Sequence, residues 1–426
     1  MARALTPIDA CALMTALVRQ ATGQTTLATV DSSNFVSAGE TVLATGKESV
    51  YNAISIVIGR TLAASRPYTA KLRSLNALNT GIYTSRLRKI SYYAKDPLES
   101  GWFNTDQNTN FADGYVSGNN GGASTNSQWE QHQAMPLEFN FAGLSTWQDC
   151  ITMYEDKVEQ AFRDINEFNT FITGILTEHA NDIESQKEAF NRMTLDTAIA
   201  ARYNYDVNLS QITDGAVNLT TAFNTYFGTN YNSQALRTTY LEDFLKFMVA
   251  TIQEYSDHME ERGTAYHLPM SKTVGGVTYS ILRHTPKDRQ RLMLYTPLLR
   301  FAQAQVMPSL FNPQYLDIKN YEGVEYWQSN YSETVRPQID MIVPYYDTVT
   351  GTQIATGSAV QIDYVVGVLF DEDAVMTDFQ LERTNVTPLE ARKGYRNSWL
   401  TFAKNAINDP TENMIVFYMD DSGVTP

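Results

Sequence analysis

The stretch EFNTFITGILTEHANDIESQKEAFNRMTLDTAIAARY, residues 167–203, decides the fold of this chain. Apolar residues recur in it at steps of three and four, which places them on one face of an α-helix. That face holds Phe168, Phe171, Ile172, Ile175, Leu176, Ile183, Phe190, Met193 and Ile199. The opposite face is polar and carries Glu178, Asp182, Glu184, Lys187, Glu188 and Arg192. Proline is absent from 142–268, so no proline ring interrupts a helix there.

A single helix over 167–203 would be about 55 Å long at ~1.5 Å per residue. An ordinary helix has only ~11–12 residues. The pattern predicts one continuous helix, with a kink near Gly174 or Asn181 as the alternative. The apolar spacing does not keep a strict heptad and a glycine interrupts it, which disfavours a coiled coil. We therefore expect a spine on which sheets and long loops are mounted.

The composition limits the functions that the chain can have. The 426 residues carry a net charge of −15, with 25 Tyr and 19 Phe. A protein that grips nucleic acid through its phosphates needs a basic surface, so that class is disfavoured. The charge fits a soluble protein, or a shell lining to which polyanions do not stick. No segment approaches the ~20 apolar residues of a membrane span, and we expect no signal peptide.

The two cysteines, Cys11 and Cys150, lie far apart in the sequence. We interpret them as free thiols in a reducing compartment.

Residues 81–145 predict a projecting arm made of two strands and a long polar tip. Leu87, Ile90 and Tyr92 indicate the first strand, and the alternating run 135–141 indicates the second. An isolated ribbon is marginal in water, so aromatic residues on the tip require a partner surface. The predicted inter-subunit contacts are Trp102, Phe103, Phe111, Tyr115 and Trp129 on the tip, with Arg86, Arg88 and Lys89 at its base. Stacking of Trp102 and Trp129 on sugars or bases is the alternative.

The other segments predict an α+β fold. We expect helices over 6–20 and 47–64, separated by an extended arm over 24–46. After the long helix, 204–232 predicts loops and short elements. A further helix over 239–262 begins with a capping box of Thr239 and Glu242 and ends at Gly263. Half of the prolines fall between Pro269 and Pro344, where short apolar runs alternate with turns. Predicted strands lie at 277–282, 292–295, 341–345, 360–364, 366–370, 375–381 and 414–418, with a short helix at 298–306 and a connecting segment at 391–405.

The sequence contains no pattern typical of an active site. It lacks GxGxxG, GxxxxGK[ST], G-x-S-x-G and CxxC, and its five histidines have no HxH or HxxxH partner. We predict no catalytic residue, no cofactor and no metal site. The acidic cluster Asp371, Glu372 and Asp373 reads as a solvated turn, with a cation or catalytic role as the alternative. Abundant carboxylates also leave a paired-acid glycosidase open.

Four basic residues follow one another closely, Arg283, Lys287, Arg289 and Arg291. Such a set can contact phosphate. Because the chain is acidic overall, we favour ion pairs with a neighbouring subunit.

Four segments resemble coat proteins of short-tailed phages related to phi-29. They are PIDACALMTALVRQATGQ at 7–24, FVSAGETVLATG at 35–46, GRTLAASRPYTAKL at 59–72 and NDIESQKEAFNRMTL at 181–195. The order of the predicted elements also resembles the major capsid protein of tailed bacteriophages, the HK-97-like fold. That resemblance covers nearly the whole chain.

The resemblance divides the chain into five segments, which form four parts. An N-terminal arm would span 1–80 and an extended loop 81–145. The peripheral domain, with the spine helix, would hold 146–290 and 366–426, and the axial domain would hold 291–365. Some members of the fold cross-link subunits through a lysine on the extended loop. Only Lys89 and Lys95 stand there in this chain, at its base, so we do not expect that chemistry.

The implied function is structural. Copies would assemble as hexamers and pentamers into an icosahedral head shell around double-stranded DNA, after a round precursor matures. The implied partners are other copies, a scaffolding protein and a portal at one vertex, and the implied location is the virion, assembled in the host cytoplasm. Two other hypotheses stand beside it: a carbohydrate-active enzyme or carbohydrate-binding module, and another virion protein such as a portal.

Overall fold

The computed structural model describes residues 11, 12, 14–16, 18, 19, 30, 31, 33–44, 71–76, 87–93, 136–141, 145–154, 156, 165–274, 277–298, 300, 320–328, 333–335, 360–422 and 424. Over 165–180 it describes the backbone only. The described chain forms two compact units. Unit 1 comprises 1–84, 144–191 and 378–405, and unit 2 comprises 85–143, 192–377 and 406–426.

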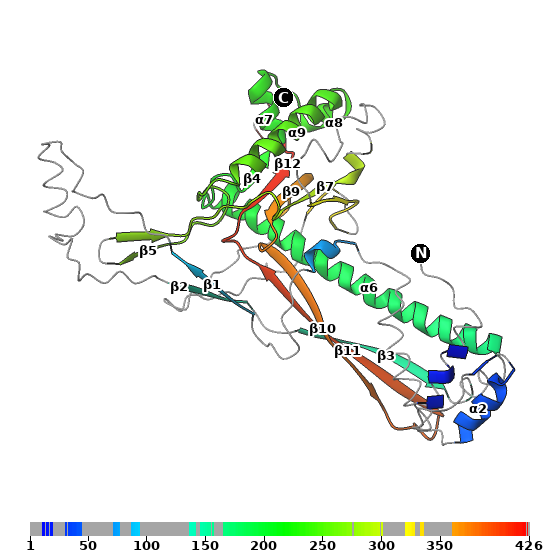
Figure 1. Cartoon of the computed structure of the whole chain (residues 1–426). Helices are drawn as coiled ribbons and strands as arrows, with labels where there is room; N and C mark the ends of the chain where they lie inside the picture. The colour runs from blue at the N-terminus through cyan, green and yellow to red at the C-terminus, as the bar shows by residue number, and fades with distance from the viewer. Residues whose placement is uncertain are drawn as a thin grey trace, which may run out of the picture. The chain divides into compact units, whose positions relative to one another are not determined.

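The long helix is continuous, as the sequence predicts. Helix α6 runs from Ile165 to Tyr203 over 39 residues and ends in a turn of π-helix at Asn204–Asn208 (Figure 1). On its polar face Asp182 is exposed, whereas Glu184, Lys187, Glu188 and Arg192 are buried. Their polar groups have partners within the chain. Glu188, for example, accepts a hydrogen bond from the backbone of Lys71 at 3.2 Å.

Unit 1 contains a three-stranded sheet that the sequence predicts only in part. Its order is β10 (Val375–Val386), β11 (Tyr395–Asn408) and β3 (Ser145–Tyr154). Strand β3 was not predicted, and β11 replaces the connecting segment expected over 391–405. Strands β11 and β3 are antiparallel, with Phe402 opposite Trp147. The rings of Trp147 and Phe379 from the sheet meet Phe190 of α6 at 5.8 and 5.6 Å, so apolar burial joins the helix to the sheet.

Unit 1 also contains helix α2, Phe35–Ala44, where an extended arm was expected. Asp31 Oδ1 accepts hydrogen bonds from the backbone of Ser33 and Asn34, and the carbonyl of Asn34 accepts the first helical bond from Ala38. Phe35 and Val42 are buried, seven residues apart on one helical face. The local cap and this burial outweigh the weak helix propensity of Val, Thr, Ser and Gly. Among residues 11–19, those described are helical as predicted, and 47–64 lies outside the described residues.

Unit 2 is built on a five-stranded mixed sheet in the order β4-β12-β9-β7-β8. The strands are β4 (Ala216–Asn218), β12 (Met414–Tyr418), β9 (Val365–Asp371), β7 (Gln290–Tyr295) and β8 (Asn320–Val324). Strand β9 pairs antiparallel with both β12 and β7, while β4 and β8 add parallel edges. Every residue of β9 and β12 is buried, as expected of central strands that read as continuous apolar runs. A Cβ on Gly367 would lie 2.3 Å from a Leu294 methyl group, so close strand packing requires glycine there.

Helices α7 (Leu219–Phe227), α8 (Ser233–Thr238) and α9 (Leu241–His258) gather beside β4 and β12 (Figure 1). Helix α9 confirms the apolar stripe predicted over 239–262, but its caps differ from the prediction. Tyr240 occupies the N-cap without a side-chain hydrogen bond, so the capping box of Thr239 and Glu242 does not form. Gly263 does not end the helix but pairs with Arg283 in an isolated bridge.

Two hairpins complete the described part of unit 2. Strands β1 (Leu87–Tyr92) and β2 (Pro136–Phe141) pair antiparallel, which confirms the predicted ribbon. Strands β5 (Ser271–Val274) and β6 (Val277–Ser280) form the second hairpin. Predicted strand 341–345 and most of helix 298–306 lie outside the described residues. Where the helices are described, none combines the length and apolar character needed to cross a bilayer.

Candidate assembly surfaces

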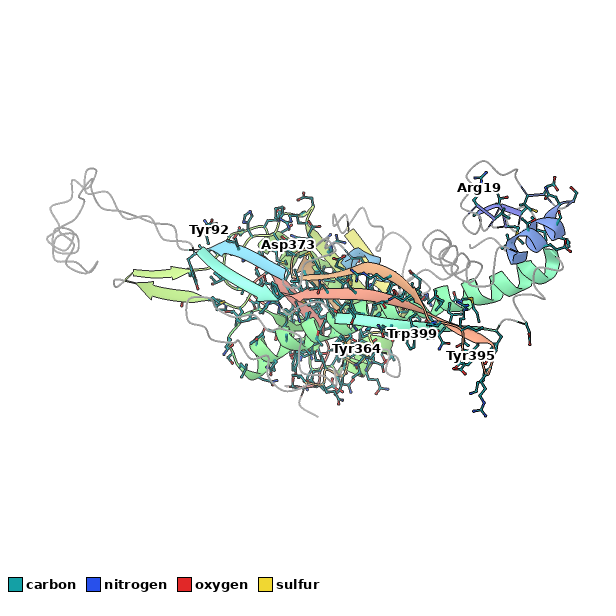
Figure 2. All side chains as sticks on the ribbon, turned by 90° about the horizontal axis from the view of Figure 1, so that it is seen from below. Arg19, Tyr92, Tyr364, Asp373, Tyr395 and Trp399 are labelled. Carbon is teal, nitrogen blue, oxygen red and sulfur yellow. The ribbon has the colours of Figure 1, made fainter. Side chains whose placement is uncertain are left out.

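The β1–β2 ribbon has an inward and an outward face, because side chains alternate along a strand. Ser91 is buried on the inner face, which also carries Lys89. Ile90 and Tyr92 point the other way and are 54% and 61% exposed. Tyr92 is labelled in Figure 2. The ribbon therefore presents a pair of large apolar side chains that nothing in the described chain covers.

Lys89 fixes the base of this ribbon to the body of unit 2. Its Nζ lies 2.7 Å from Asp409 Oδ2 and 2.6 Å from Glu412 Oε1. Arg283 Nη2 approaches the same Glu412 oxygen at 3.2 Å. Two cations thus face two carboxylates in a largely buried site. Removal of Lys89 would leave Asp409 buried without an ion-pair partner.

The electrostatics of this cluster follow from burial and from pairing. Burial would lower the pKa of Lys89, but the adjoining Asp409 and Glu412 carboxylates raise it above its usual value. Burial also opposes ionisation of Asp409, yet Lys89 and the hydrogen bonds from Thr411 hold its pKa below normal. For Glu412 the burial prevails, and its pKa is raised. Burial and ion pairing therefore act in opposite directions on each of these three side chains.

The carboxylates stand on a turn, 409–413, that Arg202 holds from the end of α6. The guanidinium of Arg202 is 1% exposed and donates to the carbonyls of Asp409 at 2.8 Å, Glu412 at 2.7 Å and Pro410. Asp409 Oδ1 in turn accepts from the backbone and hydroxyl of Thr411 at 2.9 and 2.7 Å. Charge-assisted bonds of this kind are among the stronger ones in proteins. The turn is thus a rigid mount for the ribbon.

A chain of buried polar side chains continues from the same turn. His267 Nδ1 lies 3.2 Å from Asn413 Oδ1 and its Nε2 lies 3.1 Å from the Ile281 carbonyl. Asn413 Nδ2 donates to Thr285 Oγ1 at 3.1 Å, and that hydroxyl donates to Asp371 Oδ2 at 2.9 Å. Burial lowers the pKa of His267 to about 4. The imidazole is therefore neutral at physiological pH and plays a structural part.

The four clustered basic residues, for which ion pairs with a neighbouring subunit were expected, all pair with carboxylates of their own chain. Arg283 pairs with Glu412, and Lys287 Nζ lies 2.6 Å from Asp257 Oδ1. Arg289 contacts all three members of the acidic cluster, and Arg291 contacts Glu372 at 3.3 Å.

The acidic cluster is accordingly not a simple solvated turn. Asp371 is buried and bonded to Thr285 and the backbone of Asp373, while Glu372 and Asp373 are partly exposed. Across the described ranges, no group of three or more His, Cys, Asp or Glu side chains could hold a metal ion.

Two further aromatic surfaces are exposed. In unit 2, Tyr226 and Phe227 at the end of α7 are 75% and 50% exposed and contact Phe247 of α9 at 5.7 and 6.0 Å. In unit 1, Trp399 on β11 and Tyr154 on β3 are exposed on one face of the sheet, and Tyr395 lies 5.9 Å from Tyr154 (Trp399 and Tyr395 are labelled in Figure 2).

The predicted contact residues are only partly visible. Trp102, Phe103, Phe111, Tyr115, Trp129 and Arg86 lie outside the described residues, as does Lys95. Arg88 lies in β1, and its side chain is not described. Lys89 is bound to Asp409 and Glu412 of its own chain. The inter-subunit contact of this set stays a prediction.

Sequence reasoning missed Arg202, His267 and the 409–413 turn. One local signal was available. In NDPTEN at 408–413, the Asp-Pro-Thr order is typical of a turn in which the aspartate side chain bonds the backbone two residues on. Lys89 and Asp409 are 320 residues apart, so nothing local links them.

Comparison with known proteins gives resemblance at the level of structure only. No protein-family model matches the chain, and no curated protein matches it in sequence. A capsid structure of Staphylococcus phage Andhra aligns with a TM-score of 0.49 and 10% identity over 83% of this chain and 84% of that one. A structure of the head fibre and inner core protein of native bacteriophage P68 aligns with a TM-score of 0.49 and 9% identity, over 83% of this chain and 85% of that one. The mature capsid of bacteriophage PhiM1 aligns with a TM-score of 0.41 and 9% identity, over 83% of this chain and 87% of that one.

Proposed function

We propose that this protein is the major capsid protein of a tailed bacteriophage and that its copies assemble into the head shell. The observation that carries the proposal is the β1–β2 ribbon. It is mounted rigidly through Lys89 but leaves Ile90 and Tyr92 exposed. Exposed apolar pairs on a projecting element are costly in water and are typical of surfaces that a partner covers. The aromatic surfaces of α7 and of the β3–β11 sheet add to the area available for association.

The finer assignment follows the sequence resemblance to phi-29-like coat proteins and the HK-97-like fold. In this proposal 1–80 is the N-terminal arm, 81–145 the extended loop, and α6 the spine helix. The peripheral domain holds 146–290 and 366–426, and the axial domain 291–365. The structural role is not enzymatic.

The proposed partners are other copies in hexamers and pentamers, a scaffolding protein during assembly in the host cytoplasm, and a portal at one vertex. The mature virion shell would enclose double-stranded DNA. The acidic chain, with a net charge of −15, suits a wall against which DNA is packed without binding.

The test is the size of the purified protein by light scattering and negative-stain imaging, with and without a co-expressed scaffolding candidate. We expect capsomers, sheets, tubes or closed shells. A monomer at every concentration, in both preparations, contradicts the proposal.

A further inference from the structure

A cavity of about 490 Å³ lies in unit 2 beside α8 and the ends of β7 and β9. Its volume is within the range of small-molecule sites. Its apolar walls include Leu241 and Leu298, and its polar lining includes Arg237, Thr238, Glu333 and Tyr364. It is separate from the exposed ribbon and from the Lys89 cluster, and neither of those features uses it.

Arg237 is held in a fixed orientation at this cavity. Its Nε donates to the carbonyl of Ser233 at 3.1 Å, and its guanidinium lies 4.2 Å from the centre of the Tyr364 ring. The Tyr295 ring supports Tyr364 edge-on at 5.8 Å and 84°. Stacking on an aromatic face, the backbone bond and a side-chain hydrogen bond with Tyr364 fix the orientation of the guanidinium, whose remaining N–H groups can donate to a ligand. Within the described part of the chain, Arg237 forms no ion pair with a carboxylate.

We propose that this cavity binds a carboxylate that adjoins an apolar group, with Arg237 as the anion-binding side chain. A guanidinium matches a carboxylate through two parallel hydrogen bonds. Among the described lining residues, the charge of Glu333 balances that of Arg237, which favours a ligand with a single negative charge over a phosphate dianion. The apolar walls of Leu241 and Leu298 would cover the adjoining group.

Tyr364 fits this role because it stays protonated. Burial, opposed in part by Arg237, raises its pKa to about 12. The phenol therefore adds no negative charge that would compete with the ligand. Tyr364 is labelled in Figure 2.

Such a carboxylate has two sources, a free organic acid or an acidic side chain of a protein segment. Two probe pairs separate them: phenylacetate against phenylacetamide, and N-acetyl-Leu-Asp-amide against N-acetyl-Leu-Asn-amide. Binding would be measured on the full chain by ligand-observed NMR. We expect at least one acid to bind and its neutral amide to bind about 10- to 100-fold more weakly, as expected for loss of a charged hydrogen bond. Binding of phenylacetate identifies a free acid, and binding of the dipeptide alone identifies a protein segment.

The variants are Arg237→Met and, as a matched control, Arg262→Met, which removes the same charge at an exposed position of unit 2. We expect R262M to bind like the native protein and R237M to lose the preference for acid over amide. Arg237→Lys keeps the charge and should keep part of that preference. Thermal melting followed by circular dichroism shows that each variant is folded. Equal binding of acid and amide to the native protein, or an unchanged preference in folded R237M, overturns the proposal.

Discussion

Two lysines, one in each unit, differ in the groups that surround their partly buried ammonium. Lys89 in unit 2 meets two carboxylates at 2.7 and 2.6 Å. Lys404 in unit 1 meets two aromatic rings, with its Nζ 3.7 Å from the centre of Trp147 and 4.6 Å from that of Phe190. No carboxylate among the described side chains pairs with Lys404. The pKa of Lys89 is raised, whereas burial lowers that of Lys404 to about 8.

The difference separates two kinds of buried contact. Lys89 in unit 2 belongs to a network of ion pairs that positions the ribbon. Removal of Lys89 leaves buried carboxylates without their partner. The unit 1 cation lies at the edge of a helix–sheet core, where ring faces offset only part of the cost of burial. We therefore expect opposite signs for the same substitution at the two positions.

The largest effect is expected from Lys89→Met. It leaves Asp409 buried without its ion-pair partner and Glu412 paired only with Arg283, so the free energy of unfolding should fall by about 3 kcal/mol. Urea denaturation at pH 7 measures it. The double variant Lys89→Met/Glu412→Gln should recover part of the loss, because it removes one stranded charge. A loss below about 1 kcal/mol would show that the cluster does not hold the ribbon.

The second prediction concerns His267, a neutral side chain in the buried hydrogen-bond network of unit 2. Its folded pKa, about 4, is below the unfolded value near 6.5. The unfolded chain therefore binds a proton first, and stability falls as the pH drops from about 6.5 to 4. The total is about 3 kcal/mol, at ~1.4 kcal/mol per pKa unit. Unfolding free energy measured against pH should lose this slope in His267→Gln. An identical slope in both proteins would assign the acid sensitivity to other groups.

Lys404→Met should stabilise the protein by about 1 kcal/mol at pH 7. Methionine fills the same space without a charge, and partial exposure and the cation–π contacts reduce the gain. The folded pKa, about 8, is below the unfolded value near 10.5, so the cost of the native lysine disappears as pH rises from 8 to 10.5. The gain in melting temperature should shrink over that range. Destabilisation at pH 7 would mean that the ring contacts outweigh burial.

The smallest effect is expected from Lys246→Ala on α9. Lys246 and Glu242 form a 2.7 Å pair one turn apart, but their side chains are 47% and 61% exposed. Solvent screens such a pair, so the change should leave the urea midpoint almost unchanged. This variant is the surface reference for the two lysines above, measured by the same urea curves. A loss comparable to that of Lys89→Met would remove the distinction between buried and exposed pairs.

The features that the sequence predicted well are those with a local apolar pattern. Helices α6 and α9 carry apolar residues at helical spacing, and strands β9 and β12 carry continuous apolar runs typical of buried central strands. Strand β3 was missed because its outer face is polar, with Thr146, Gln148 and Thr152, and because Trp147 pairs with Phe402, which is remote in sequence. Helix α2 was missed because a cap and burial, not propensity, stabilise it.

The candidate surfaces were predictable only in outline. Alternation in 87–92 predicts a ribbon, and the structure adds that Lys89 faces inward while Ile90 and Tyr92 face outward. Ion-pair partners could not be read from sequence. Arg289 and Arg291 look like free cations beside one another, and only the register of β7 on β9 brings them to Glu372. Long-range pairing has no local pattern.

The most direct test of the account is particle formation by the double variant Ile90→Ser/Tyr92→Ser, followed by gradient sedimentation and negative-stain imaging. The control is Leu209→Ser, another exposed apolar residue of unit 2, 49% exposed. We expect the native protein and the control to form large assemblies. The ribbon variant should melt at the native temperature but sediment as small species. Full-sized particles from the folded ribbon variant would contradict the claim that this ribbon joins neighbouring copies.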